Sequence, residues 1–213
     1  MMYWSNYFMV LGVFSMGLIS PGPDFAVVLQ SSILGGRSSG YRTAVGIAVG
    51  LTFHIGFCVM GLGYVLKNWP NVFVLLQCCG GIYLMHLGAS SFLQMKRFAP
   101  SVKIEEADSL EFQRPFAKGV ITNLLNPKAT LSFWIIFSSL IPWEMAQGYR
   151  WIYGGSMIVM ALGWFLFVAH LITWKRILTQ VKKASTFMSI AMTGLFFCLG
   201  GFAVAQSLLH WIG

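Results

Sequence analysis

The charged residues of this chain are gathered into short segments, and the long stretches between them carry no charge at all. No Lys, Arg, Asp or Glu occurs in 43–66, 68–95, 151–174 or 184–213. A helix needs about 20 consecutive apolar residues to cross the hydrocarbon core of a bilayer, so each stretch is long enough for one crossing. Only 9% of the residues are charged, against about 25% in an average soluble domain. The sequence therefore predicts an integral membrane protein.

The membrane-spanning elements are predicted to be helices. Lipid offers no hydrogen-bond partners to an exposed backbone, so only helices or a closed barrel span a bilayer, and these apolar runs are too long for barrel strands. The first run has no basic segment ahead of it and exceeds the length of a secretory signal, so we expect a retained span. The expected fold is an all-α membrane protein with six transmembrane helices near 3–34, 41–66, 71–94, 116–141, 151–173 and 187–211.

The distribution of cations predicts the orientation of the chain. With six spans, the connections after spans one, three and five share a side that holds eleven cations, whereas the other side holds only Lys67 and Arg150. Because cytoplasmic loops are enriched in Lys and Arg, both termini are predicted to lie outside the cytoplasm. The net charge of +8 follows from this topology and predicts no nucleic-acid partner. The eleven cations are Arg37, Arg42, Lys96, Arg97, Lys103, Arg114, Lys118, Lys175, Arg176, Lys182 and Lys183.

The chain is predicted to contain two three-helix repeats, 1–95 and 116–213, joined by a cytoplasmic connector at 96–115. Three spans in each half invert the second half relative to the first, and inverted repeats are an architecture of secondary transporters. Two sequence similarities between the halves support this division. Phe14-x-x-Gly17 matches Phe116-x-x-Gly119, and Cys78-Cys79-Gly80-Gly81 resembles Cys198-Leu199-Gly200-Gly201.

Spans one and four are each interrupted by proline, at Ser20-Pro21-Gly22-Pro23 and at Asn126-Pro127. Proline removes a backbone donor and clashes with the preceding turn, and a polar residue before a proline is typical of a helix N-cap. New half-helices are therefore predicted to begin at Ser20 and Asn126. Because the two spans run in opposite directions, two positive helix ends would converge near the midplane and bind a substrate carboxylate there. The alternative is a pair of kinks that only shape the fold.

Two charges directly follow these breaks, Asp24 in the first half and Lys128 in the second. A carboxylate inside a membrane costs roughly 2.5 to 3.5 kcal/mol on insertion scales, so Asp24 requires compensation. It is a candidate ligand for a substrate ammonium, a candidate carrier of the coupling proton, or a structural partner of Lys128, and the sequence leaves these roles open. The predicted substrate-binding residues are Ser20, Pro21, Gly22, Pro23, Asp24, Asn123, Asn126, Pro127 and Lys128.

One face of span two carries Gly46, Gly50 and His54, spaced by four residues. Small residues at this spacing are typical of close helix packing in membranes. His54 is an ionisable group within a span, so it is a candidate proton-coupling residue together with Asp24. The alternative is a packed, neutral imidazole.

Other classes of function have little support in the sequence. The chain lacks the H-E-x-x-H and G-x-S-x-G motifs of common hydrolases and the G-x-x-x-x-G-K-[ST] loop of an ATP-driven pump. Its cysteines lie within apolar runs and lack C-x-x-C spacing. We therefore expect neither an enzyme nor a cofactor or metal site, and keep a membrane carrier of a soft metal ion or of thiol reducing equivalents as the alternative. The cysteines are Cys58, Cys78, Cys79 and Cys198.

The two proline motifs also carry a family resemblance. Ser20-Pro21-Gly22-Pro23-Asp24-Phe25 and Gly119-x-x-Thr122-Asn123-Leu124-x-Asn126-Pro127-Lys128-Ala129 make the chain similar to the LysE/RhtB family of bacterial amino-acid exporters. The resemblance implies a multi-pass exporter of neutral amino acids, such as threonine, homoserine or leucine, in the bacterial cytoplasmic (inner) membrane, driven by proton antiport. The expected partners are a small amino acid, protons and the lipid bilayer, and a homodimer is expected because small transporters of this size often pair.

Overall fold

The structure is a computed structural model that describes residues 4–19, 22–94, 114–142, 144–171, 190 and 193–209. Every regular element in these ranges is helical, and none of them contains a strand. Pro23–Gly61 and Gln147–Leu171 are long and apolar enough to cross a membrane, and Trp4–Ile19 and Thr193–Leu209 are shorter apolar helices. The all-α fold is therefore confirmed for the described residues, while the six spans and the two inverted repeats stay predictions.

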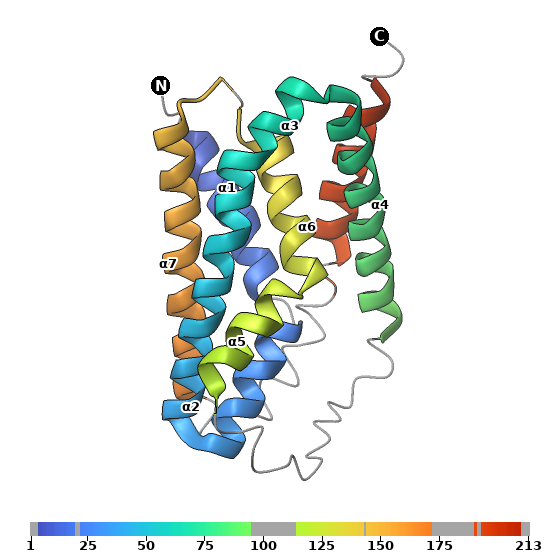
Figure 1. Cartoon of the computed structure of the whole chain (residues 1–213). Coiled ribbons are helices and arrows are strands. Elements are labelled where there is room, and N and C mark those ends of the chain that lie inside the picture. The colour runs from blue at the N-terminus through green and yellow to red at the C-terminus, as the bar shows by residue number, and fades with distance from the viewer. Residues whose placement is uncertain are drawn as a thin grey trace.

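The helices lie side by side in one elongated bundle (Figure 1). η1 is a π-helical segment that joins α2 to α3 without a break. η4 is a second π-helical segment, and it extends α6. The last helix, Thr193–Leu209, packs near α4 and α6 and is called the C-terminal helix below. The labelled elements are α1 (Trp4–Ile19), α2 (Pro23–Gly56), η1 (Phe57–Gly61), α3 (Leu62–Asn68), α4 (Pro70–Gln94), α5 (Pro115–Leu124), α6 (Pro127–Ile135), η4 (Ile136–Leu140) and α7 (Gln147–Leu171).

A sharp turn at Gly36 divides α2 into a first arm, residues 23–35, and a second arm, residues 37–56. Gly36 has φ 74° and ψ −179°, a conformation that is open to glycine because it has no Cβ. Helical geometry continues on both sides of this residue. The turn between the first two predicted spans is therefore much shorter than the expected interval 35–40.

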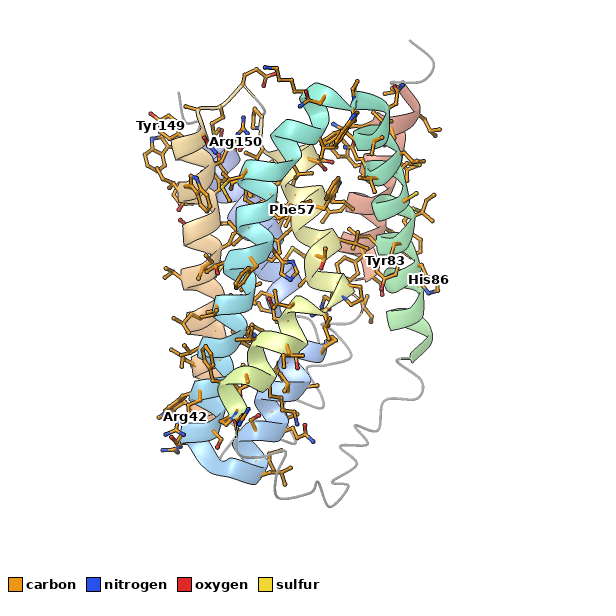
Figure 2. The ribbon with its side chains drawn as sticks, viewed as in Figure 1. Arg42, Phe57, Tyr83, His86, Tyr149 and Arg150 are labelled. Atoms are coloured by element: carbon orange, nitrogen blue, oxygen red, sulfur yellow. The ribbon has the colours of Figure 1, made fainter. Side chains whose placement is uncertain are left out.

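The chain passes back and forth along the bundle (Figure 1). α1 and the first arm of α2 run toward the lower end, the second arm and α3 return, and α4 descends again. α5 and α6 then ascend, α7 descends, and the C-terminal helix ascends. Arg42 lies at the lower end and Arg150 at the upper end (Figure 2). The expected connector at 96–115 lies almost entirely outside the described residues, so the proposed repeat boundaries stay predictions.

Glycines bring the second arm of α2 into backbone contact with α5. A Cβ at Gly46 would collide with the carbonyl oxygen of Phe116, and a Cβ at Gly119 would collide with the carbonyl oxygen of Thr43. Gly46 therefore lies against a carbonyl group of α5 that is one turn before Gly119. Gly119 lies against a carbonyl group of α2 that is one turn before Gly46. Small residues permit this close approach in membranes, and the predicted packing role of Gly46 and Gly50 is confirmed.

A second glycine contact joins α4 to the C-terminal helix. A Cβ at Gly81 would lie 2.7 Å from the carbonyl oxygen of Gly200, and a Cβ at Gly200 would collide with the carbonyl oxygen of Gly81. These glycines come from the two segments whose sequences resemble each other. The similar segments of the two halves therefore pack directly against each other.

Hydrogen bonds hold α1 against α7 and the end of η4. Asn6 Nδ2 donates to the carbonyl oxygen of Leu140 at 3.0 Å, and the buried Tyr153 hydroxyl donates to Asn6 Oδ1 at 2.7 Å. The hydroxyls of Tyr7 and Ser156 lie 2.6 Å apart. This network holds the first turn of α1 against α7 and the end of η4.

Candidate functional site

The first helix break separates α1, which ends at Ile19, from α2, which begins at Pro23. Gly22 is the N-cap, with an extended backbone of φ −169° and ψ −178°. A residue before proline is disfavoured in the helical region, so Pro23 prevents the helix from starting earlier. The predicted N-cap at Ser20 is therefore wrong: the cap is Gly22, and Ser20 and Pro21 lie outside the described residues.

The second break lies between α5 and α6, as predicted. α5 ends at Leu124, and α6 begins at Pro127 with Asn126 as its N-cap. The Asn126 side-chain oxygen accepts a hydrogen bond from the Lys128 backbone N–H at 3.0 Å. Asn126 is 4% exposed, so water cannot easily replace this cap. The predicted N-cap role of Asn126 is confirmed.

Asn126→Ala is expected to lower the free energy of unfolding by about 1 kcal/mol, the usual cost of losing an N-cap side chain. Alanine cannot accept the hydrogen bond from Lys128 N–H. SDS unfolding of the detergent-solubilised protein, followed by circular dichroism, measures this change. Asn126→Ser is the matched control, since serine caps helices about as well as asparagine, and it should recover most of the loss. Equal stability of the alanine variant and the wild type would contradict the capping role.

Pro127 leaves the carbonyl group of Asn123 without its normal helical donor, because proline has no N–H to offer four residues later. Two other groups donate to this oxygen. Asn126 N–H lies at 3.0 Å, and His54 Nε2 on the second arm of α2 lies at 3.0 Å. The break therefore creates an acceptor that joins α5 to α2.

Asn123 also connects this junction to Asp24. Its side-chain Nδ2 donates to Asp24 Oδ2 at 2.9 Å, across two elements that are 99 positions apart in sequence. Asn123 is completely buried. Asp24 Oδ1 is buried as well and has no hydrogen-bond partner within the part of the chain that the structure describes. A buried acceptor without a donor is costly, so Asp24 Oδ1 is suited to receive a proton or an N–H group from a ligand.

Lys128 brings a positive charge to the same region. It lies in the first turn of α6, where a cation opposes the helix dipole. Lys128 lines the same cavity as the Asp24 carboxylate, and its ammonium lies 5.6 Å from the centroid of the Phe196 ring. A cation above an aromatic face is stabilised by the ring electrons. The ring, and the opposite charge of Asp24 in the same cavity, each offset part of the cost of placing Lys128 there.

A cavity of about 70 Å³ lies between the two breaks. Gly22 and Asp24 line it from the first break, and Asn126 and Lys128 line it from the second. Asn123 and His54 do not line the cavity. Asn123 contacts Asp24, and His54 contacts the backbone carbonyl group of Asn123. The prolines at both breaks, Pro23 and Pro127, are exposed and shape the helix starts without lining the cavity.

Several further residues line the cavity that sequence reasoning did not find. Ser132 lies one turn beyond Lys128 on α6, and Phe196 comes from the C-terminal helix. Aromatic residues facing lipid and aromatic residues facing a cavity look alike in such an apolar sequence. Only Ser132 had a local signal, since it follows Lys128 by four residues and so shares its helix face.

The alternative of a metal or thiol carrier gains no support from the described residues. Among them, no three His, Cys, Asp or Glu side chains come together as metal ligands. Cys58 is buried, Cys79 and Cys198 are exposed, and Cys78 is intermediate. None of these cysteines lines the cavity between the breaks.

Comparison with known proteins identifies relatives over most of the chain. The family described as LysE type translocator matches residues 15–207. The threonine efflux protein of Escherichia coli (strain K12) is 31% identical over 157 residues, which cover 73% of this chain and 76% of that protein. The threonine efflux protein of Salmonella typhi is 31% identical over 169 residues, covering 78% of this chain and 81% of that protein.

A longer match joins the chain to a membrane protein of Bacillus subtilis (strain 168), YrhP, which is 27% identical over 202 residues, covering 91% of this chain and 94% of that protein. No solved structure matches the chain. The family match confirms the resemblance seen in the proline motifs, and with it a bacterial membrane protein that is a transporter and not an enzyme. The chain belongs to the family of LysE type translocators.

Proposed function

We propose that this protein exports neutral amino acids across the bacterial cytoplasmic membrane in exchange for protons. The observation that carries the proposal is the cavity between the breaks, where Asp24 and Lys128 present opposite charges. An amino acid is a zwitterion, so it offers an ammonium to a carboxylate and a carboxylate to an ammonium. The similarity to two threonine efflux proteins supports an amino acid as the substrate.

The substrate ammonium is proposed to bind Asp24 Oδ1, the acceptor that has no donor among the described residues. The substrate carboxylate is proposed to bind Lys128 and the first turn of α2. The cap residue of α2, Gly22, has no side chain, so among the described residues the N–H groups of the first turn after Pro23 are proposed to be open to an anion. At α6, by contrast, Asn126 already caps the helix. The proposed binding region includes both motifs. Gly22, Asp24, Asn126 and Lys128 line the cavity, Pro23, Asn123 and Pro127 are proposed to hold these residues in place, and Ser20 and Pro21 precede them in the sequence.

Asp24 is also proposed to carry the coupling proton. A proton and a substrate ammonium compete for the same buried carboxylate, so each leaves when the other binds. Proton entry from outside would release the amino acid outward, and proton loss to the cytoplasm would free the site for the next one. This competition yields antiport without a second titratable group.

The proposed topology has six spans in two inverted repeats, 1–95 and 116–213, with both termini outside the cytoplasm. The alternating chain path supports it (Figure 1), as does the contact between Gly81 and Gly200 from the two similar segments. Arg42 then lies at the cytoplasmic end (Figure 2). Rocking of the two repeats about the cavity is the proposed transport motion.

Proteoliposomes with an imposed pH gradient test the function. We expect labelled threonine, homoserine and leucine to be driven by the gradient, whereas lysine and glutamate should move far more slowly because each adds an unpaired charge. Liposomes without protein provide the background. Failure to move any amino acid, with movement of a soft metal ion or of thiol reducing equivalents instead, would overturn the proposal.

A further inference from the structure

We infer that Gly50 and His54 are positioning residues that hold Asn123 against Asp24, and that His54 serves as a fixed hydrogen-bond donor. This inference rests on the proposed function, because it assigns how the transport site is held in shape. Gly50 and His54 lie one turn apart on the face of α2 that packs against α5. Gly50 lies against the side chain of Asn123, and His54 contacts the backbone carbonyl group of Asn123.

Gly50 provides the space that the Asn123 side chain occupies. A Cβ at position 50 would lie 2.6 Å from Asn123 Oδ1 and 2.9 Å from Asn123 Cβ. These distances are shorter than van der Waals contact, so any larger residue at position 50 must displace Asn123. Both the end and the Cβ of this side chain would have to shift, and the side chain is fully buried. Its hydrogen bond to Asp24 would be lost with the displacement.

His54 fixes the backbone at the end of α5. Its Nε2 lies 3.0 Å from the carbonyl oxygen of Asn123. A carbonyl oxygen only accepts hydrogen bonds, so Nε2 must carry the hydrogen. The ring lies nearly parallel to that of Phe133, with centroids 6.3 Å apart and planes inclined by 9°. The imidazole is therefore held on two sides in the orientation that the bond requires.

The Asp24 carboxylate sets the orientation of the Asn123 amide. A carboxylate oxygen only accepts hydrogen bonds, so Nδ2 donates to Asp24 Oδ2, and Asn123 Oδ1 faces Gly50 with no hydrogen-bond partner among the described residues. This donation occupies one carboxylate oxygen and leaves Asp24 Oδ1 for a ligand. The inference therefore assigns His54 the role of a donor and leaves the coupling proton to Asp24.

A set of His54 variants separates a donor from a proton carrier. Glutamine places an amide N–H near the position of Nε2 but cannot release a proton at neutral pH, whereas asparagine is one methylene too short to reach. In proteoliposomes driven by a pH gradient, with labelled L-threonine as the probe, His54→Gln should keep at least about half of the wild-type rate. His54→Asn and His54→Ala should each lose about tenfold, as for a lost buried hydrogen bond. A glutamine variant as inactive as the alanine variant would overturn the inference.

Gly50→Ala tests the other half of the contact. We expect about a tenfold loss of L-threonine transport, because the added methyl group displaces Asn123. Gly163→Ala is the matched control, since a Cβ at Gly163 meets no atom within 4 Å, and its rate should equal that of the wild type. Size-exclusion chromatography and circular dichroism establish that both variants are folded. Wild-type transport by the folded Gly50→Ala protein would contradict the positioning role.

A spectroscopic readout tests the inference independently of transport. Nitrogen-15 NMR of the imidazole groups in the full-length protein should give a protonated Nε2 for His54, assigned as the signal that is missing from His54→Gln. His86→Gln is the control, because His86 is exposed on the outer face of α4 (Figure 2). An unprotonated Nε2 would overturn the inference even if transport is normal. If no amino acid moves but Nε2 is protonated, the proposed function fails while the assignment of the donor stands.

Discussion

Asp24→Asn is expected to reduce proton-driven amino-acid transport by about 100-fold or more. The variant removes one member of the proposed charge pair between Asp24 and the substrate ammonium, and such a loss costs about 2 to 5 kcal/mol when the pair is buried. The asparagine side chain has the shape of aspartate and still offers an oxygen to Asn123 Nδ2, so the hydrogen bond at 2.9 Å can persist. What disappears is the charge that would bind a substrate ammonium and the group that would carry a proton. Transport of labelled threonine into proteoliposomes under a pH gradient measures the effect.

Exchange without a pH gradient separates the roles of Asp24. A residue that only carries the proton would leave threonine–threonine exchange intact when it is replaced, whereas a residue that also binds the ammonium would lose both activities. We expect both to be lost. Glu144→Gln is the matched control, because Glu144 is an exposed acid near the start of α7, and it should leave both rates unchanged. Normal transport by Asp24→Asn would reduce Asp24 to a structural partner of Lys128.

The helix breaks were predictable because proline acts locally. Pro127 has no N–H, and Asn126 before it has a side chain that caps the next helix, so the second break was predicted to the residue. The first break contains two prolines. The prediction placed the N-cap before the first of them, at Ser20, whereas the cap of α2 is the residue before the second, Gly22. The steric effect of Pro23 on Gly22 was present in the sequence, and it places the helix start two residues later than Ser20.

The partners of the breaks could not be predicted, because they depend on packing between distant segments. His54 and Asn123 are 69 positions apart, and Asn123 and Asp24 are 99 apart. Glycine spacing in span two indicated a close helix contact, but it did not indicate that α5 would be the neighbour. Phe196 was missed for the same reason, since nothing in its local sequence separates it from an aromatic residue that faces lipid.

Gly46→Ala and Gly119→Ala are each expected to lower the free energy of unfolding by about 1 to 3 kcal/mol, the usual cost of overpacking a close contact. In both variants the new methyl group meets a backbone carbonyl, of Phe116 or of Thr43 respectively, and backbone cannot move aside like the end of a flexible side chain. α2 and α5 must therefore separate. Unfolding in SDS, followed by circular dichroism, measures the loss.

The double variant gives a sharper test of this contact. If one methyl group already separates α2 from α5, the second meets less resistance, so the two losses should sum to more than the loss measured for the double variant. Gly155→Ala on α7 is the control, because a Cβ there meets no atom within 4 Å, and alanine is about 1 kcal/mol more favourable than glycine in a helix. The same separation should also weaken transport, since it moves Asn123 away from Asp24. Wild-type stability of both single variants would show that the glycine contact does not hold α5, and with it the second break, in place.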